Sequence, residues 1–140
     1  MNEKFLIVIP IPTKVLSPNF TVGGIGGRMM VAASRRRFRR ITREAIEAEQ
    51  IDTMPWGKVA VSPVLYYKTN RRHDIDNAMG SLKSVYDGIV DSGLVPDDTQ
   101  EYMKREELIL DVDKNCPRVI MCIERIKCWP EKRNSESITS

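Results

Sequence analysis

The segment RRHDIDNAMGSLKSVYDGIVDSGLVPDDTQ, residues 71–100, decides the fold that this sequence predicts. Its apolar residues recur at helical spacing, which predicts an amphipathic helix from about Asp76 to about Gly93. The expected buried face of that helix consists of Ala78, Leu82, Val85, Tyr86 and Ile89. Asp74 or Asp76 would cap its beginning, and Gly93 would take the left-handed conformation that commonly ends a helix.

The elements around this helix predict an α+β fold. The sequence patterns indicate an earlier helix, the first in the chain, at about 29–50 and strands at about 4–11, 58–68, 105–112 and 119–127. Pro63 favours an edge strand or a bulge, and the glycines of segment 23–27 favour a flexible loop. We therefore expect a small mixed or antiparallel sheet with two principal helices. They would form one domain over residues 1–128, followed by a flexible polar tail at 129–140.

The composition fits one ordinary cytoplasmic domain. The 140 residues include 22 basic and 19 acidic side chains, a net charge of +3 that by itself identifies no partner. Cys116, Cys122 and Cys128 fit neither a zinc site nor a closed set of disulfides, so we expect free thiols in a reducing cytoplasm. The apolar run at 5–9 is too short to span a bilayer, and the glycine spacing is not a dinucleotide fingerprint. We expect neither a membrane partner nor an organic cofactor.

Two acidic pairs flank the decisive helix. Carboxylates that lie close together repel one another unless a cation or a proton separates them, and oxygen ligands favour Mg²⁺ or Mn²⁺. Asp74 and Asp76 are two positions apart, so in an extended segment both would point the same way. Asp97 or Asp98 would complete a metal site if the chain folds back. The alternative remains that the first pair caps the helix and the second forms a turn.

Lys83 lies on the same helix, on the side that also carries Asp76 and away from the apolar stripe. There it could contact a phosphate or stabilise developing negative charge. The alternative is a surface lysine that pairs with Asp87 one turn later, which contributes little to stability. The sequence leaves both interpretations open.

The first helix carries a crowded set of arginines: Arg35, Arg36, Arg37, Arg39, Arg40 and Arg43. All but Arg37 fall on one side of the helix, and Arg71 and Arg72 add a second cationic element before the acidic pair. The opposite side is apolar and consists of Val31, Phe38, Ile41, Ala45 and Ala48. Like charges one turn apart destabilise a helix, and a nucleic acid backbone would relieve that repulsion. The alternative is a solvated face that is helped by Glu44, Glu47 and Glu49.

Several of these residues keep a spacing that is found in a known family: Asp74-x-Asp76-Asn77, Lys83, Asp87-Gly88, Gly93 and Asp97-Asp98. The pattern resembles the RusA family of Holliday-junction resolvases, which are small enzymes of bacteria and their prophages. The N-terminal Pro10-x-Pro12 and Ser17-Pro18-Asn19 are also similar to that family. The resemblance extends to about Ile126.

The resemblance implies a RusA-like, homodimeric endonuclease that needs Mg²⁺ or Mn²⁺ and cuts opposed strands of a four-way DNA junction. It also implies that Asp74, Asp76 and Asp98 are catalytic metal ligands and that Lys83 is the catalytic lysine. In the family, that lysine lies six residues after the first aspartate, where this chain has Gly80. Lys83 aligns if three residues are inserted, which is nearly one helical turn.

The expected DNA-binding residues are Asn19, Arg35, Arg36, Arg39, Arg40, Arg43, Arg71 and Arg72. Two other functions remain open. Gly80 keeps a non-catalytic, structure-selective DNA-binding protein in consideration. The acidic pairs are also compatible with a nuclease that acts on other branched DNA or on RNA.

Overall fold

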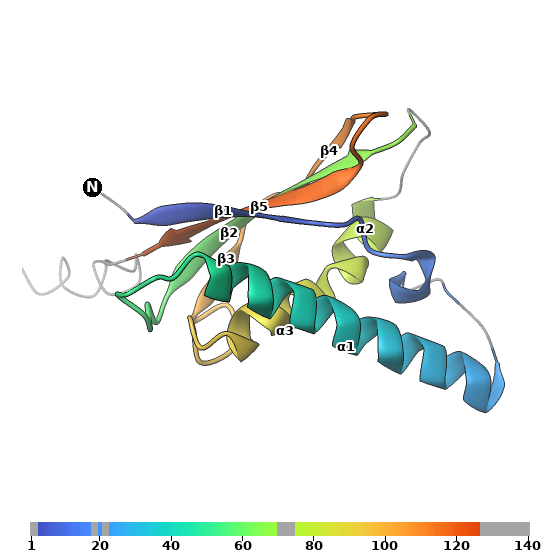
Figure 1. The fold of residues 1–140 in the computed structure, drawn as a ribbon, viewed down its shortest axis with the longest axis horizontal. Helices are drawn as coiled ribbons and strands as arrows, with labels where there is room; N and C mark the ends of the chain where they lie inside the picture. Colours follow the sequence, from blue (N-terminus) through green and yellow to red (C-terminus); the bar gives the residue numbers. More distant parts are fainter. Residues whose placement is uncertain (1–2, 18–19, 21–22, 70–74, 127–140) are drawn as a thin grey trace, which may run out of the picture.

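The computed structural model describes residues 3–17, 20, 23–69 and 75–126. The helices are η1 (Lys14–Leu16, a 3₁₀ helix), α1 (Gly24–Ala48), α2 (Ile75–Ser81) and α3 (Lys83–Asp91). The strands are β1 (Lys4–Ile9), β2 (Val59–Tyr67), β3 (Met103–Arg105), β4 (Ile109–Val112) and β5 (Arg118–Arg125). Figure 1 shows the sheet above the helices, with α1 and α3 on the same side of it. The chain therefore has the expected α+β architecture.

The sheet has five strands in the order β1-β5-β2-β3, and β4 also pairs with β2. β5 is antiparallel to both β1 and β2, whereas β3 and β4 run parallel to β2. The sheet is therefore mixed, which was one of the two expected forms. A parallel connection needs a long crossover, and α2 and α3 supply it between β2 and β3. This crossover carries most of the predicted catalytic residues.

The expectation for Pro63 was wrong, because β2 is an interior strand and not an edge. The strand expected at 105–112 is also two strands, which pair with β2 one after the other. The Val59 N–H donates to Tyr102, and the Val61 carbonyl accepts from Glu106 on the same side of β2. Pro63 therefore turns its missing N–H toward this side, at the break between β3 and β4, where no ladder hydrogen bond is lost.

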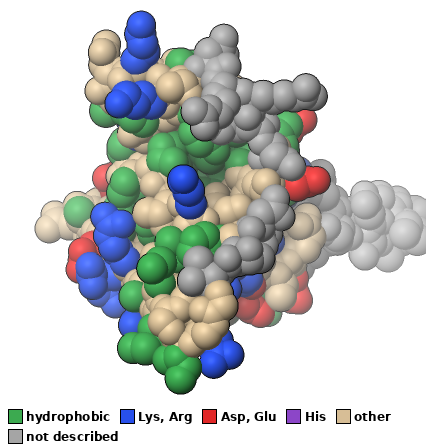
Figure 2. All heavy atoms as spheres, turned by 90° about the vertical axis from the view of Figure 1, so that its right-hand side faces the viewer, with side chains coloured by type: hydrophobic (Ala, Val, Ile, Leu, Met, Phe, Trp, Pro, Cys, Tyr) green, Lys and Arg blue, Asp and Glu red, His purple; other side chains and the backbone are tan. Residues whose placement is uncertain are grey.

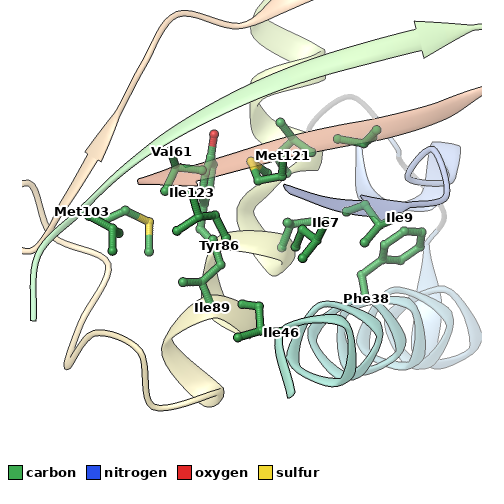
Figure 3. Close-up of a cluster of buried hydrophobic side chains, with 14 of the residues drawn as sticks. Ile7, Ile9, Phe38, Ile46, Val61, Tyr86, Ile89, Met103, Met121 and Ile123 are labelled. Carbon is green, nitrogen blue, oxygen red and sulfur yellow. The ribbon is translucent and has the colours of Figure 1, made fainter. Parts of the chain in front are cut away.

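The hydrophobic core lies between the sheet and the helices (Figure 3). Alternate residues of β1 and β5 point into it, as the two-residue period of a strand requires. Phe38 and Ile46 of α1 and Ile89 of α3 are fully buried against these strands. The expected buried face of the decisive helix is confirmed for all its residues. On α1, Ala48 is exposed and Ile46 is buried in its place.

Both helix predictions need correction at their ends. The glycines of segment 23–27 do not form a loop, because α1 begins at Gly24. Extending a formed helix adds a hydrogen bond per residue, which offsets the cost of about 1 kcal/mol for each glycine. The second predicted helix is interrupted at Leu82, which separates α2 from α3. Gly93 does follow α3 in a left-handed conformation, with φ of 88°.

Gly88 fixes how closely α3 approaches α1. A Cβ atom at this position would lie 2.6 Å from the Thr42 Cβ atom and 2.7 Å from the Arg39 carbonyl oxygen. No larger residue fits without a shift of the α1 backbone, so glycine allows the two helices to pack. The close approach also brings Arg39 beside Asp91.

Cys116 and Cys122 are free thiols, as expected. Cys128 and the tail predicted at 129–140 lie outside the described residues, as do Asn19, Arg71, Arg72 and Asp74. Among the helices that the structure describes, none is long and apolar enough to cross a membrane.

Candidate functional site

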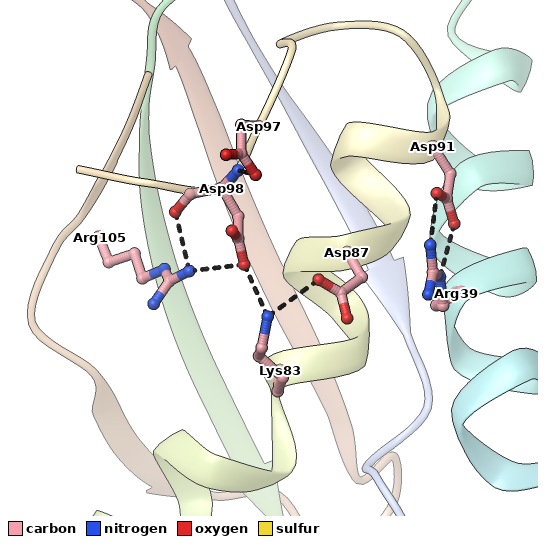
Figure 4. A network of polar contacts seen from close by, with 7 residues as sticks. All are labelled: Arg39, Lys83, Asp87, Asp91, Asp97, Asp98 and Arg105. Atoms are coloured by element: carbon pink, nitrogen blue, oxygen red, sulfur yellow. Dashed lines mark hydrogen bonds and ion pairs between the residues drawn. The ribbon is translucent and has the colours of Figure 1, made fainter. Parts of the chain in front are cut away.

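Lys83 and Asp98 meet at the beginning of α3 (Figure 4). The Lys83 Nζ atom donates to Asp98 Oδ2 at 2.8 Å and to Asp87 Oδ1 at 3.1 Å. Lys83 and Asp87 are one helical turn apart, so the helix itself aligns them. Asp98 reaches them because Gly93 turns the chain after α3. The contact joins residues that are 15 positions apart in the sequence.

Arg105 completes this network, although it was not among the site residues predicted from the sequence. Its Nη2 atom donates to Asp98 Oδ2 at 3.0 Å and to the Asp98 carbonyl oxygen at 2.9 Å. Its guanidinium group lies 4.6 Å from the centroid of the Tyr86 ring, which holds it by a cation–π contact. Arg105 ends β3, and no motif marks it. Its role depends on a strand pairing that the sequence did not predict.

The contacts within the network favour the charged forms of Lys83 and Asp98. The hydrogen bond to Asp98 raises the pKa of the Lys83 ammonium, and the bond to Asp87 adds to this effect. The hydrogen bond from Lys83 lowers the pKa of the Asp98 carboxyl, and the charge of Arg105 lowers it further. The Asp98 side chain is 18% exposed and that of Lys83 is 63% exposed. A cationic head group therefore lies in solvent beside a shielded carboxylate.

Asp76, the other predicted metal ligand that the structure describes, is not part of this network. Asp76 lies exposed in the first turn of α2, inside the helix and not at its cap, and the contacts of Lys83 and Asp98 do not include it. Asp97 accepts the Asp98 backbone N–H at 2.8 Å, which is the contact of a turn. Asp74 lies outside the described residues. Over residues 3–17, 20, 23–69 and 75–126, no three acidic, histidine or cysteine side chains gather to hold a metal ion.

The expected arginine face divides into two groups. Arg39 makes a bidentate contact with Asp91, with both N–O distances at 2.8 Å. The Arg43 Nε atom lies 3.7 Å from Glu47 Oε2. In the described part of the chain, no ion pair involves Arg35, Arg36 or Arg40, which are exposed. These three keep their charge available for a ligand. Arg43 follows the alternative of a solvated face helped by Glu47, whereas Arg39 pairs with Asp91 of α3, a contact that the sequence did not predict.

Figure 2 looks onto the end of the molecule that lies at the right of Figure 1. Basic and hydrophobic side chains are intermingled on this face, and acidic side chains lie mainly toward its margins. Such a surface favours a ligand that carries both negative charge and apolar area. A search against protein-family models and a search of curated proteins each found no match for this chain.

Proposed function

We propose that this chain is a metal-dependent endodeoxyribonuclease that resolves four-way DNA junctions by paired, symmetric phosphodiester hydrolysis. One observation carries the proposal: Lys83 and Asp98, which the resemblance to the RusA family implies are both catalytic, are in contact at 2.8 Å. A surface lysine that only paired along its helix would contact Asp87 alone. The additional contact with Asp98 supports a shared site.

The donor chemistry at this site fits a hard cation. Asp87 and Asp98 already converge on one positive centre, the Lys83 ammonium, within 3.1 Å. In the proposed site, Asp74, Asp76 and Asp98 would hold Mg²⁺, and Mn²⁺ would substitute for it because both prefer oxygen ligands. The ion would supply Lewis-acid activation of the phosphate and a more acidic bound water.

The chain's own cations take different parts in this proposal. Lys83 contacts the phosphate at the cleavage site, where its ammonium stabilises developing negative charge. Arg105 is a positioning residue, because it holds both the side chain and the backbone carbonyl of Asp98. Arg35, Arg36 and Arg40 contact neighbouring phosphates, which set the register of the DNA.

We further propose a homodimer. A four-way junction has approximate two-fold symmetry, so two equivalent sites in a two-fold assembly would make the paired cuts. A cytoplasmic location agrees with the free thiols of Cys116 and Cys122.

A specific observation favours a second candidate, a DNA-binding protein without turnover. Asp98 is already neutralised by two cations, Lys83 and Arg105. A metal ion would have to displace at least one of them, at the cost of an ion pair. If this exchange does not occur, the same surface would bind junctions and leave them intact.

The test is cleavage of a labelled synthetic four-way junction in Mg²⁺, Mn²⁺ or EDTA, beside duplex and flap DNA. We expect symmetric nicking of the junction alone, which requires a divalent metal. Asp76→Asn and Asp98→Asn should abolish cleavage and keep junction binding, whereas the exposed loop variant Asp52→Asn is the matched control. Tight binding without cutting in either metal would establish the second candidate, and equal cutting of flaps would replace the resolvase with another branched-DNA nuclease.

A further inference from the structure

A cavity of about 630 Å³ lies directly beside Lys83, between η1, α1 and the α2–α3 crossover. Lys83 and Asp87 belong both to its wall and to the Lys83–Asp98 network. The volume is typical of a pocket that receives a small ligand or one unit of a polymer. A second hollow of about 590 Å³ continues from it along α1 and shares Phe20, Val31 and Arg35 with it.

Besides Asp87, the described residues that line the cavity include apolar, basic and hydroxyl side chains. An apolar wall is formed by Val15, Leu16, Phe20 and Val31. Arg35 and Arg39 contribute positive charge, and Ser81 and Ser84 contribute hydroxyl groups. A nucleotide offers the three complementary features: an aromatic face that stacks, a phosphate that is negative and a base edge that forms hydrogen bonds.

Ser84 provides an independent reason to expect a polar ligand. Its side chain is only 4% exposed, and its hydroxyl has no hydrogen-bond partner among the residues that the structure describes. Ser81, by contrast, donates to the Ala78 carbonyl at 2.7 Å. Buried polar groups are nearly always hydrogen-bonded, because leaving one unsatisfied is costly. A ligand atom in the cavity would satisfy the Ser84 hydroxyl.

The cations of the wall are not equally available. Arg39 is held by Asp91, and Lys83 is held by Asp87 and Asp98. Arg35 has no ion pair within the described ranges, and it lines both hollows. Arg35 is therefore the cation that can bind a phosphate here without breaking an existing contact.

We propose that this cavity receives one unstacked nucleotide of the branched DNA, with the base against Phe20 and Val31, the base edge at Ser84 and the phosphate at Arg35. This inference rests on the proposed function and adds the structural feature that the site would recognise. In intact duplex every base is stacked and paired, so extracting one costs free energy. Near the crossover of a junction that cost is lower, and the cavity would then select branched DNA.

The test is equilibrium binding in EDTA, so that no strand is cut. The fluorescent base 2-aminopurine is placed at successive positions near the crossover of a four-way junction, where unstacking increases its fluorescence. We expect a saturable increase at one position, with none in matched duplex. Val31→Trp, which fills the cavity, should abolish the increase and weaken junction binding about 10-fold, as expected for the loss of one stacked base.

Two further variants keep the test decisive if Val31→Trp does not fold. Arg35→Ala combined with Ser84→Ala should also remove the increase at saturating protein. Arg40→Ala is the matched control: it removes an arginine of α1 that does not line the cavity, so it should weaken binding to all DNA and retain the increase.

The outcomes separate this inference from the proposed function. Preferential junction binding without an increase at any position would overturn the nucleotide pocket and leave the resolvase proposal standing. Binding of single-stranded 2-aminopurine DNA that Val31→Trp abolishes, without preference for junctions, would retain a nucleotide pocket and overturn both the branched-DNA ligand and the resolvase. An increase that all three variants preserve would place the unstacked base outside this cavity.

Discussion

The two ends of α3 carry ion pairs of different kinds. At its C-terminal end, Asp91 and Arg39 of α1 are matched one to one, through two bonds of 2.8 Å. At its N-terminal end, the partners are shared: Lys83 contacts two carboxylates, and Asp98 accepts hydrogen bonds from both Lys83 and Arg105. Figure 4 shows both arrangements in one view.

The helix dipole disfavours a cation at the N-terminus of a helix and an anion at its C-terminus. Lys83 and Asp91 therefore both need partners of opposite charge. Arg39 donates a hydrogen bond to each carboxylate oxygen of Asp91, so this ion pair links α1 to α3. In the N-terminal network, Lys83 keeps Asp87 as a partner if it loses Asp98, and Asp98 keeps Arg105 if it loses Lys83. A site that binds a charged ligand needs side chains that can exchange partners. A purely structural ion pair such as Arg39–Asp91 does not need this. The comparison predicts that substitutions at the N-terminal end of α3 mainly affect activity, whereas substitutions at its C-terminal end mainly affect stability.

The largest expected effect separates the two ends by activity. Asp98→Asn should lower the rate of junction cleavage by at least about 100-fold, as for the loss of a group that stabilises the transition state. Asp91→Asn should leave cleavage within about 3-fold and lower thermal stability slightly, because the pair is partly exposed. Single-turnover cleavage and thermal denaturation of both variants provide the measurement. A comparable loss of cleavage in Asp91→Asn would remove the distinction between the ends.

The next effect distinguishes the arginines of α1 that have no ion pair within the described residues from Arg39, which pairs with Asp91. Arg36→Ala combined with Arg40→Ala should weaken junction binding and reduce the slope of log affinity against log salt by about 2, because two phosphate contacts are lost. Arg39→Ala is the control, since Asp91 already neutralises that side chain. Binding isotherms at several salt concentrations measure the slope. If the double variant keeps the wild-type slope, this face of α1 does not contact DNA.

A substitution in the middle of α3 tests whether the close packing of α3 against α1 contributes to the stability of the fold. Gly88→Ala should lower the free energy of unfolding by about 1–3 kcal/mol, because the new methyl group would overlap α1. Gly26→Ala is the matched control: a Cβ atom there meets nothing within 4 Å, so helix propensity should make it neutral or stabilising. Urea denaturation measures both variants. An unchanged Gly88→Ala protein would show that α1 and α3 can separate without cost.

The sequence predicted those features that depend on local spacing. Helical periodicity identified the buried residues of α2 and α3. The resemblance to the RusA family, and not the spacing, implied that Lys83 and Asp98 act together, and their side chains are in contact. Arg105 could not be found in the same way, because it reaches Asp98 only after β3 has paired with β2. Gly88 is visible as a glycine within a helix, but the backbone that approaches it comes from α1.

Pro63 shows the limit of a local rule. A proline was expected at an edge because it cannot donate to a ladder, yet two short strands leave a gap opposite it within the sheet. The gap arises because the segment that the sequence predicted as one strand forms two strands, β3 and β4, which pair with different parts of β2. Ser84 shows the same limit for the site. Its burial, and the lack of a hydrogen-bond partner for its hydroxyl among the described residues, depend on how the surrounding elements pack.

The smallest expected effect distinguishes the ends by their response to acid. Ion pairs lower the pKa values of both Asp91 and Asp98 below the ordinary 3.8. Their stabilisation is therefore present above that value and is lost as the pH falls through the lowered pKa. Replacing either aspartate by asparagine should flatten the acid limb of stability against pH, with about 0.5 kcal/mol expected for Asp91→Asn and less for Asp98→Asn. The Asp98→Asn change should be the smaller of the two, since Lys83 and Arg105 lose one shared partner while Lys83 keeps Asp87. Denaturation at pH values from about 3 to about 6 measures the difference. An equal change in the pH dependence of stability in both variants would show that the Lys83–Asp98 network stabilises the fold as much as the Arg39–Asp91 pair does.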